Sequence, residues 1–290
     1  MMKVSGFTFI RNAVKYDYPI VEAINSILPV CDEVIVAVGN SEDDTRTLIE
    51  NIKDSKIKII DTIWDDNLRE GGQVLAVETD KAFDAIDPSS DWAIYIQGDE
   101  VLHEKYIPVL MDGMREWREN KMVEGLLFDY KHFYGSYNYV GDSHRWYRRE
   151  VRVIKNDKSI RSYKDAQGFR KNNRPLNVKK INAVMYHYGW VKPPEAQQAK
   201  QQSFNRLWHT DEWVEKKIPK VDTFDYSQID SLALFKDSHP KVMKERIDAL
   251  NWEFSFDPAN KRLPFKSVLL NKIELLTGWR PGEYKNYKLI

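Results

Sequence analysis

The residues best suited to chemistry follow one apolar strand segment. Residues 94–96 (Ile-Tyr-Ile) run directly into Gln97-Gly98-Asp99-Glu100. Carboxylates at the carboxyl end of a strand stand where a hard cation and a diphosphate can meet, because Mg²⁺ and Mn²⁺ prefer oxygen ligands and keep positions open for substrate phosphates. A solvated turn is the alternative, since Gly-Asp pairs are common in turns. Asp99 is therefore a candidate metal ligand, with Glu100 available nearby.

A basic and aromatic stretch is the second candidate. Residues 144–149 (His-Arg-Trp-Tyr-Arg-Arg) place three arginines among two aromatic side chains. Arginine binds diphosphate oxygens through two parallel hydrogen bonds, so Arg148 is expected to contact a phosphate of the donor or of a phosphate-bearing lipid acceptor. The alternative is a solvated strand face paired with Glu150, because runs of charge usually lie on the surface.

These candidates need a framework that positions them. Apolar strand segments alternate with amphipathic helical segments, and the strand segments are residues 6–10, 33–38, 57–60 and 92–96. This alternation predicts right-handed crossovers and an α/β fold with a mainly parallel sheet flanked by helices. Ligands of such sheets bind beyond the carboxyl ends of the strands. The loops at that edge are residues 11–12, 39–45, 61–73 and 97–103, and all are polar.

The pattern changes in the second half of the chain. Residues 124–130, 151–154 and 183–188 are further strand candidates, and from Pro193 the chain becomes helical and charged. We expect an α/β domain over residues 1–190 and a mainly helical C-terminal extension over residues 191–290 that packs on it. Residues 200–209 mix basic and aromatic types at helical spacing, which favours packing against the domain.

Composition restricts the class of protein. The 44 Lys and Arg residues balance 44 Asp and Glu residues, so the basic excess of a nucleic-acid-binding protein is missing. Cys31 is the only cysteine, which excludes an internal disulfide and a cysteine zinc cluster and favours a reducing, cytoplasmic setting. The first residues lack the apolar segment of a secretory signal, and no stretch approaches the roughly 18 continuous apolar residues of a membrane helix.

The order of these motifs resembles the family 2 glycosyltransferases, which have the GT-A fold. The opening strand followed by Arg11-Asn12 is similar to the first strand of that family and its polar turn. Residues 37–45 (Ala-Val-Gly-Asn-Ser-Glu-Asp-Asp-Thr) resemble the segment after the second strand, where many members have V-D-D-G-S-x-D-x-T. Gln97-Gly98-Asp99 stands where the family has its D-x-D metal motif. The similarity in order and spacing covers roughly residues 3–190.

The resemblance implies a function and roles for individual residues. Such an enzyme transfers a sugar from a nucleotide-diphosphate donor to a hydroxyl of a saccharide or lipid-linked acceptor, assisted by Mn²⁺ or Mg²⁺. His187 ends a late strand where related enzymes place a further metal ligand, so it would join Asp99. Asp165 would be the base for an inverting reaction, with Asp129 and Asp142 as rivals. The residues expected to bind the donor are Arg11, Asn12, Gly39, Asn40, Ser41, Arg69, Gln73, Gln97, Gly98 and Arg148.

The sequence departs from the family pattern at two places. Val38 and Gly39 replace the paired aspartates after the second strand, one of which commonly contacts the base, so the base stays open. Gln97 can coordinate only through a neutral amide oxygen, which implies a weaker metal site. These changes motivate one alternative to an active enzyme, an inactive sugar-nucleotide-binding or scaffold protein on the same fold. For an active enzyme the resemblance suggests surface polysaccharide or lipopolysaccharide assembly, in the cytoplasm or in peripheral contact with the inner face of the membrane.

Overall fold

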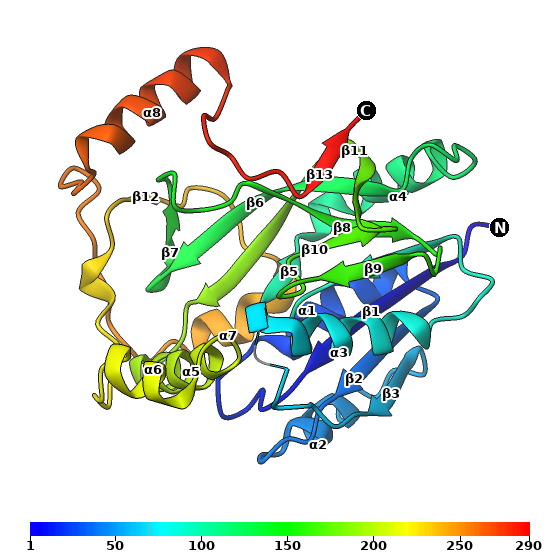
Figure 1. Cartoon of the computed structure of the whole chain (residues 1–290), viewed down its shortest axis with the longest axis horizontal. Coiled ribbons are helices and arrows are strands. Elements are labelled where there is room, and N and C mark those ends of the chain that lie inside the picture. Colours follow the sequence, from blue (N-terminus) through cyan, green and yellow to red (C-terminus); the bar gives the residue numbers. More distant parts are fainter. Residues whose placement is uncertain (69) are drawn as a thin grey trace.

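The computed structural model describes residues 1–68 and 70–290. The described residues form a single 13-stranded sheet whose main path runs β3-β2-β1-β4-β8-β6-β11-β10-β9, with helices on both sides (Figure 1). The predicted α/β architecture is confirmed. The sheet as a whole is mixed, with its parallel strands concentrated in the N-terminal half.

Four parallel strands form the N-terminal half. They are β1 (Val4–Ile10), β2 (Glu33–Val38), β3 (Ile57–Asp61) and β4 (Trp92–Tyr95), close to the ranges expected from the sequence. Helices connect them: α1 (Ile20–Ile27), α2 (Thr45–Glu50) and α3 (Gln73–Asp84). Parallel pairing requires such crossovers, because a tight turn cannot return the chain in the same direction.

Successive side chains along these strands point to opposite faces of the sheet, so the sheet has one hydrophobic core on each face. On β2, Val34, Val36 and Val38 face the core beneath α1, α2 and α4 (Ile107–Glu116), whereas Ile35 and Ala37 face the core beneath α3. Burial on both faces explains why β2 is apolar at almost every position.

Hairpins make the second half of the sheet mixed. Its strands are β5 (Glu100–Leu102), β6 (Gly125–Tyr134), β7 (Ser136–Gly141), β8 (Arg149–Lys155), β9 (Ile160–Tyr163), β10 (Gly168–Lys171) and β11 (Arg174–Trp190). β8 lies between β4 and β6 and is antiparallel to both. β6 and β7 are joined at Gly135, whose φ of 71° suits a tight reversal.

The C-terminal residues return to the sheet. The elements here are α5 (Pro194–Arg206), α6 (Asp211–Lys217), β12 (Leu232–Leu234), α7 (Lys244–Asp248), α8 (Phe265–Thr277) and β13 (Tyr287–Leu289). β12 pairs with β7, and β13 pairs with β11, so this region adds strands as well as helices. Phe204 and Leu207 pack on the core beneath α3, which confirms the packing expected for residues 200–209. The division at residue 190 stays a prediction.

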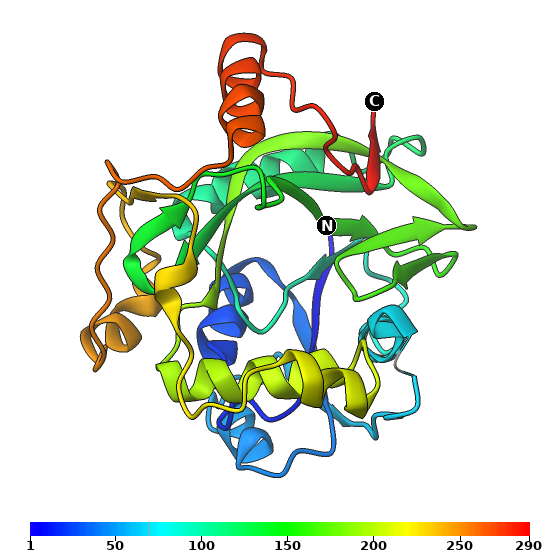
Figure 2. The ribbon, with the colours of Figure 1, turned by 60° about the vertical axis from the view of Figure 1, so that its left-hand side comes forward.

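α8 stands apart from the body of the molecule (Figure 2). Within residues 1–68 and 70–290, no helix combines the length and apolar content needed to cross a bilayer.

Candidate functional site

A cavity of about 720 Å³ lies at the carboxyl edge of the parallel strands. Its walls come from the end of β1, the turn after β4, the tip of the β9–β10 hairpin, the end of β11 and the helix α5. This is the edge at which open α/β sheets bind ligands. The predicted residues that line it are Arg11, Asn12, Gln97, Gly98, Asp99, Asp165 and His187.

Strand pairing brings the two predicted metal ligands together. β5 runs antiparallel to β11, with Glu100 opposite His187. The backbone N–H of Tyr188 donates to the carbonyl oxygen of Asp99 at 2.8 Å, which extends the pairing by one residue. As a result, Nε2 of His187 lies 3.7 Å from Oδ1 of Asp99.

His132, on β6, determines which nitrogen of His187 carries the proton. Nε2 of His132 lies 2.6 Å from the carbonyl oxygen of Tyr147, which can only accept, so this nitrogen carries a hydrogen. Burial lowers the pKa of His132 well below its usual value, which leaves its Nδ1 bare in the neutral ring. Nδ1 of His187, 3.2 Å away, must therefore donate to it. Burial also lowers the pKa of His187, so its Nε2 is unprotonated and faces Asp99.

The space between Asp99 and His187 fits a divalent cation. Two electron-pair donors face each other there with no proton between them, and the N–H at Nδ1 of His187 is held by His132. A Cβ at Gly189 would lie 2.7 Å from Oδ2 of Asp99 and 2.8 Å from Nε2 of His187, so the glycine keeps this space open. Among the described residues, no group of three His, Cys, Asp or Glu side chains could hold a metal ion. A cation would thus take two protein ligands and leave the other positions to phosphate and water.

Glu100 is not available to this site, and the expectation that it is was wrong. Its carboxylate is fully buried and accepts two hydrogen bonds from Arg152, both at 2.8 Å, and one from the Tyr130 hydroxyl at 2.7 Å. A buried carboxylate needs such partners, because an unpaired charge away from water is costly. The pair is structural and fixes the strand that follows Asp99.

Lys200, on α5, is a residue of the site that the sequence did not indicate. Its Nζ lies 3.1 Å from Oδ2 of Asp99 and 3.1 Å from the carbonyl oxygen of Gly189. Burial alone would lower the pKa of Lys200, but Tyr18 and Asp99 outweigh it, and the pKa is raised. Burial alone would raise the pKa of Asp99, but Lys200, His187 and Lys192 hold it well below its usual value. Asp99 is therefore ionised, with one oxygen held by Lys200 and the other facing His187.

Asp165 reaches the cavity from the tip of the β9–β10 hairpin. Both of its neighbours have left-handed backbone angles, with φ of 55° at Lys164 and 62° at Ala166. Such angles cost of order 1–3 kcal/mol in a residue other than glycine and cluster at functional sites. Burial raises the pKa of Asp165, which makes its carboxylate a better proton acceptor. The side-chain amide of Gln97 lies 3.3 Å from the carbonyl oxygen of Ala166 and ties this tip to the turn that carries Asp99.

The two rival aspartates are engaged elsewhere. Asp129 pairs with Arg149 at 2.9 Å and with Lys180 at 2.7 Å. Asp142 accepts hydrogen bonds from Ser231 and from Lys261, each at 2.5 Å. Neither is among the residues that line the cavity. Of the three candidates, Asp165 alone lines the cavity.

Some of the predicted donor-binding residues line the cavity, and others support the residues that line it. Asn12 has a φ of 56°, its N–H donates to Oγ of Ser41 at 3.0 Å, and its Oδ1 accepts from the N–H of Glu42 at 2.8 Å. Oδ1 of Asn40 accepts from the N–H of Trp64 at 3.1 Å. Trp64 packs so closely on Gly39 that a Cβ there would lie 2.4 Å from its Nε1.

Gly39, Asn40 and Ser41 thus shape the wall formed by Trp64 and Asn12 and are not themselves among its lining residues. The structure does not bring Gln73 or Arg148 to the cavity lining. Gln73 begins α3 and is exposed. Arg148 binds Glu283 through its Nε at 2.5 Å and Glu274 through its Nη1 at 3.0 Å, which ties it to the C-terminal region. Arg69 lies outside the described residues.

Comparison with known proteins gives distant likenesses of fold. No family model matches this chain, and no curated protein matches its sequence. The crystal structure of S. aureus TarS is similar at a TM-score of 0.40 and 14% identity, over 70% of this chain and 39% of that chain. This chain therefore spans well under half of the length of that protein.

Two further solved structures are similar to this chain. The structure of S. aureus TarS 1–349 in complex with UDP has a TM-score of 0.41 and 15% identity, over 69% of this chain and 64% of that one. Glucosyl-3-phosphoglycerate synthase from Mycobacterium tuberculosis, in complex with Mn²⁺, UDP and phosphoglyceric acid, has a TM-score of 0.29 and 19% identity, over 46% of this chain and 43% of that one.

Proposed function

We propose that this chain is a glycosyltransferase that moves a sugar from a nucleotide-diphosphate donor to a hydroxyl acceptor, with inversion at the anomeric carbon. The observation that carries the proposal is the meeting of Asp99, His187 and Asp165 in one cavity at the carboxyl edge of the parallel strands. An ionised carboxylate beside a neutral imidazole suits a divalent cation, which the diphosphate end of a donor would bind. A second carboxylate of raised pKa suits the acceptor end.

The diphosphate end of the site would be built around Asp99. Asp99 and His187 would hold Mn²⁺ or Mg²⁺, which when bound neutralises the charge that builds up on the leaving diphosphate. Lys200 fixes Asp99 from the side opposite His187 and adds positive charge to the same wall of the cavity. His132 keeps His187 in the tautomer that can bind a cation.

Asp165 would be the base at the acceptor end. It takes the proton of the acceptor hydroxyl, the acceptor oxygen forms a bond to the anomeric carbon, and the bond from that carbon to the diphosphate oxygen breaks. This single displacement inverts the anomeric carbon. The hydrogen bond from Gln97 to the carbonyl oxygen of Ala166 helps to hold the tip that carries this carboxylate, and such a base must be held in position.

The nucleotide end would lie along the wall formed by Arg11, Asn12 and Trp64. The guanidinium of Arg11 lies 2.9 Å from Asp66 and over the Trp64 ring, 5.5 Å from the ring centre, so a fixed charged group and an indole stand on the same wall. Aromatic faces and fixed polar groups are what a nucleoside needs for stacking and hydrogen bonding. The predicted roles in surface polysaccharide or lipopolysaccharide assembly, and the predicted cytoplasmic location, belong to this proposal.

A donor-binding panel tests the proposal. UDP-sugars and GDP-sugars are added with and without Mn²⁺, and CMP-sugars serve as a monophosphate control, with the melting temperature as readout. A ligand at a hundredfold excess over its dissociation constant stabilises the fold by about 2.7 kcal/mol. We expect a Mn²⁺-dependent shift with one diphosphate donor that is lost in Asp99→Asn.

Turnover separates the enzyme from the alternative, an inactive sugar-nucleotide-binding or scaffold protein. Two features of the site motivate that alternative. Within the part of the chain that the structure describes, the cation has two candidate protein ligands and no group of three, and the side-chain amide of Gln97 is turned toward Ala166. A donor that binds but is never consumed, with a broad set of saccharide and lipid-linked acceptors, would favour the alternative. No shift with any donor in metal-loaded protein would refute the proposed function.

A further inference from the structure

Helix α8 exposes an unusual amount of apolar surface. Phe265, Leu275 and Leu276 are each more than 80% exposed, Leu269 is half exposed, and no residue of the helix is buried. Trp279, just beyond its end, is 62% exposed. Single exposed apolar side chains are ordinary on any protein surface, but a group of them on one element marks an interaction site.

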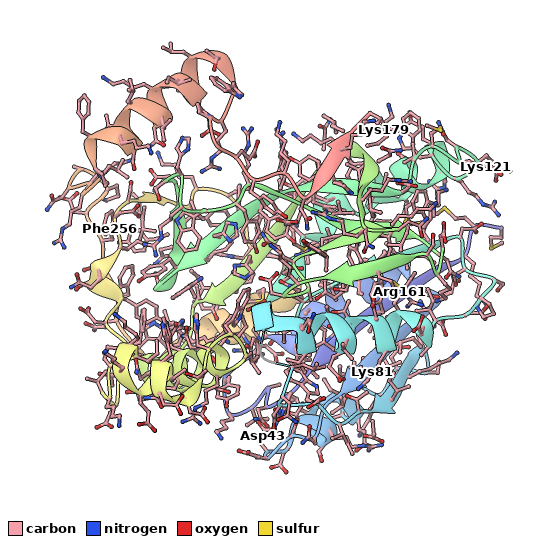
Figure 3. All side chains as sticks on the ribbon, viewed as in Figure 1. Asp43, Lys81, Lys121, Arg161, Lys179 and Phe256 are labelled. Atoms are coloured by element: carbon pink, nitrogen blue, oxygen red, sulfur yellow. The ribbon has the colours of Figure 1, made fainter. Side chains whose placement is uncertain are left out.

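These side chains lie on one face of the helix. Relative to Phe265, Val268 and Leu269 stand three and four residues on, and Leu275 and Leu276 ten and eleven residues on, so they fall on one face of α8, with Lys272 between the two pairs. Glu274, on the other side, lies 3.0 Å from both His144 and Arg148 in the body of the protein. The contacts of Glu274 therefore set the rotation of the helix and turn the apolar stripe outward. In Figure 1 the helix stands away from the sheet, and in Figure 3 side chains along it project into open space.

The charges around this stripe are of one sign. Residues 258–290 contain seven Lys and Arg residues but only two acidic ones, although the whole chain is neutral. The acidic side chains, Glu274 and Glu283, both bind Arg148 and so face inward. Lys266 and Lys272 on the helix are exposed. Lys285 and Lys288 are exposed too, but they belong to the segment that returns to β11 as β13. The outward face of α8 is therefore apolar and cationic.

We propose that α8 is a peripheral anchor that docks this protein on an anionic phospholipid surface. An apolar stripe bordered by lysines fits the boundary between lipid headgroups and acyl chains, where the stripe enters and the ammonium groups stay among the phosphates. A second copy of this chain is a poor occupant, because two cationic faces would repel each other. The inference does not depend on the transferase proposal, because α8 supplies no residue to the cavity lining.

Vesicle flotation of the full chain tests the anchor. Vesicles of phosphatidylcholine are compared with vesicles that also contain phosphatidylglycerol, at low and high salt. We expect the chain to float with the anionic vesicles, and less so at high salt. The double variant Leu275→Asn/Leu276→Asn should bind at least about tenfold more weakly, because each leucine loses its transfer into the apolar phase.

Matched variants make the outcome decisive. Lys266→Glu/Lys272→Glu should lose the preference for anionic lipid. Ile63→Asn/Met122→Asn changes two other strongly exposed apolar residues, 77% and 65% exposed, away from α8, and should bind as the unchanged protein does. All of these side chains are exposed, so an unchanged melting temperature verifies folding. The proposal is overturned if the unchanged chain stays with the buffer, if it binds both vesicle types equally, or if it is a dimer that Leu275→Asn/Leu276→Asn makes monomeric.

Discussion

Glu150, on β8, gives a prediction in which an isosteric change stabilises the protein in a pH-dependent way. Its side chain is 4% exposed, and one carboxyl oxygen accepts a hydrogen bond from Nε2 of Gln167 at 2.7 Å. Burial, with Glu100 and Asp165 nearby, raises the pKa of Glu150 from 4.5 to about 8, against the opposing effects of Arg152 and Gln167. In the folded protein Glu150 is therefore a neutral acid at pH 7, whereas in the unfolded chain it is ionised.

The sign of the effect follows from that difference. A raised folded-state pKa means that the contribution of Glu150 to stability is complete below about pH 4.5 and is lost as the pH rises toward 8. Each pH unit within that window costs about 1.4 kcal/mol, so the loss between pH 5 and pH 7 is about 2 to 3 kcal/mol. Glu150→Gln keeps the shape and the oxygen that accepts from Gln167 but has no proton to lose. It should therefore gain about 2 to 3 kcal/mol relative to the unchanged protein over the same interval.

Urea unfolding at pH 5, 6 and 7 measures this gain as the difference in unfolding free energy between the two proteins. Glu124→Gln is the control of opposite sign, because Arg174, Asn177 and Lys171 outweigh burial and lower the pKa of Glu124 to about 2. Its stabilising effect is present above about pH 4.5 and is lost as the pH falls toward 2, so this variant should be destabilised by a nearly constant amount from pH 5 to 7. If the difference for Glu150→Gln is equally flat, the assignment of a neutral buried acid is refuted.

Three further predictions concern the cavity. His132→Phe should weaken Mn²⁺ binding to the donor-free protein by about 10- to 100-fold in calorimetry, because His187 loses the partner that sets its tautomer. The control is His103→Phe, which changes another buried histidine. Equal Mn²⁺ affinities for both variants would contradict the role of His132. Gly189→Ala should abolish Mn²⁺ binding while the protein still folds, since the added Cβ takes the space beside Asp99; normal binding in a folded Gly189→Ala protein would show that the ion sits elsewhere. Asp165→Asn should lower kcat by about 10²–10⁴ and leave the dissociation constant of the donor unchanged. The control, Asp129→Asn, should keep its kcat. A lowered kcat in Asp129→Asn with a normal kcat in Asp165→Asn would assign the base to Asp129.

Much of the N-terminal half could be predicted from the sequence. The apolar runs at β1 to β4 are bounded by polar turns, and buried parallel strands leave that signal in any chain. The hairpin β9–β10 and the three-residue strands β12 and β13 were missed, because short edge strands carry neither a long apolar run nor a clear alternation.

The composition of the site was harder to predict than its position. Asp99 follows β4 and His187 lies near the end of β11, and both line the cavity as expected, while their role as metal ligands stays a prediction. Lys200, on α5, looks like any surface lysine of a charged helix until the fold places it against Asp99. Glu100 looked available as a ligand because the residues next to it in the sequence do not indicate that Arg152 is its buried partner. Ion pairs between residues that are far apart in the sequence produce no local sequence pattern from which they could be predicted.

The position of β11 in the sheet has a consequence for how the chain is made. This strand supplies His187 and pairs with β5, β6, β10 and β13, so the sheet is completed late in synthesis. Until residues 174–190 leave the ribosome, β5 lacks its partner and β6 has one open edge, and such edges invite association with other chains. The contacts that β11 closes are far apart in sequence, which slows folding. A nascent or truncated chain that ends before β11 is therefore the form of this protein most in need of a chaperone.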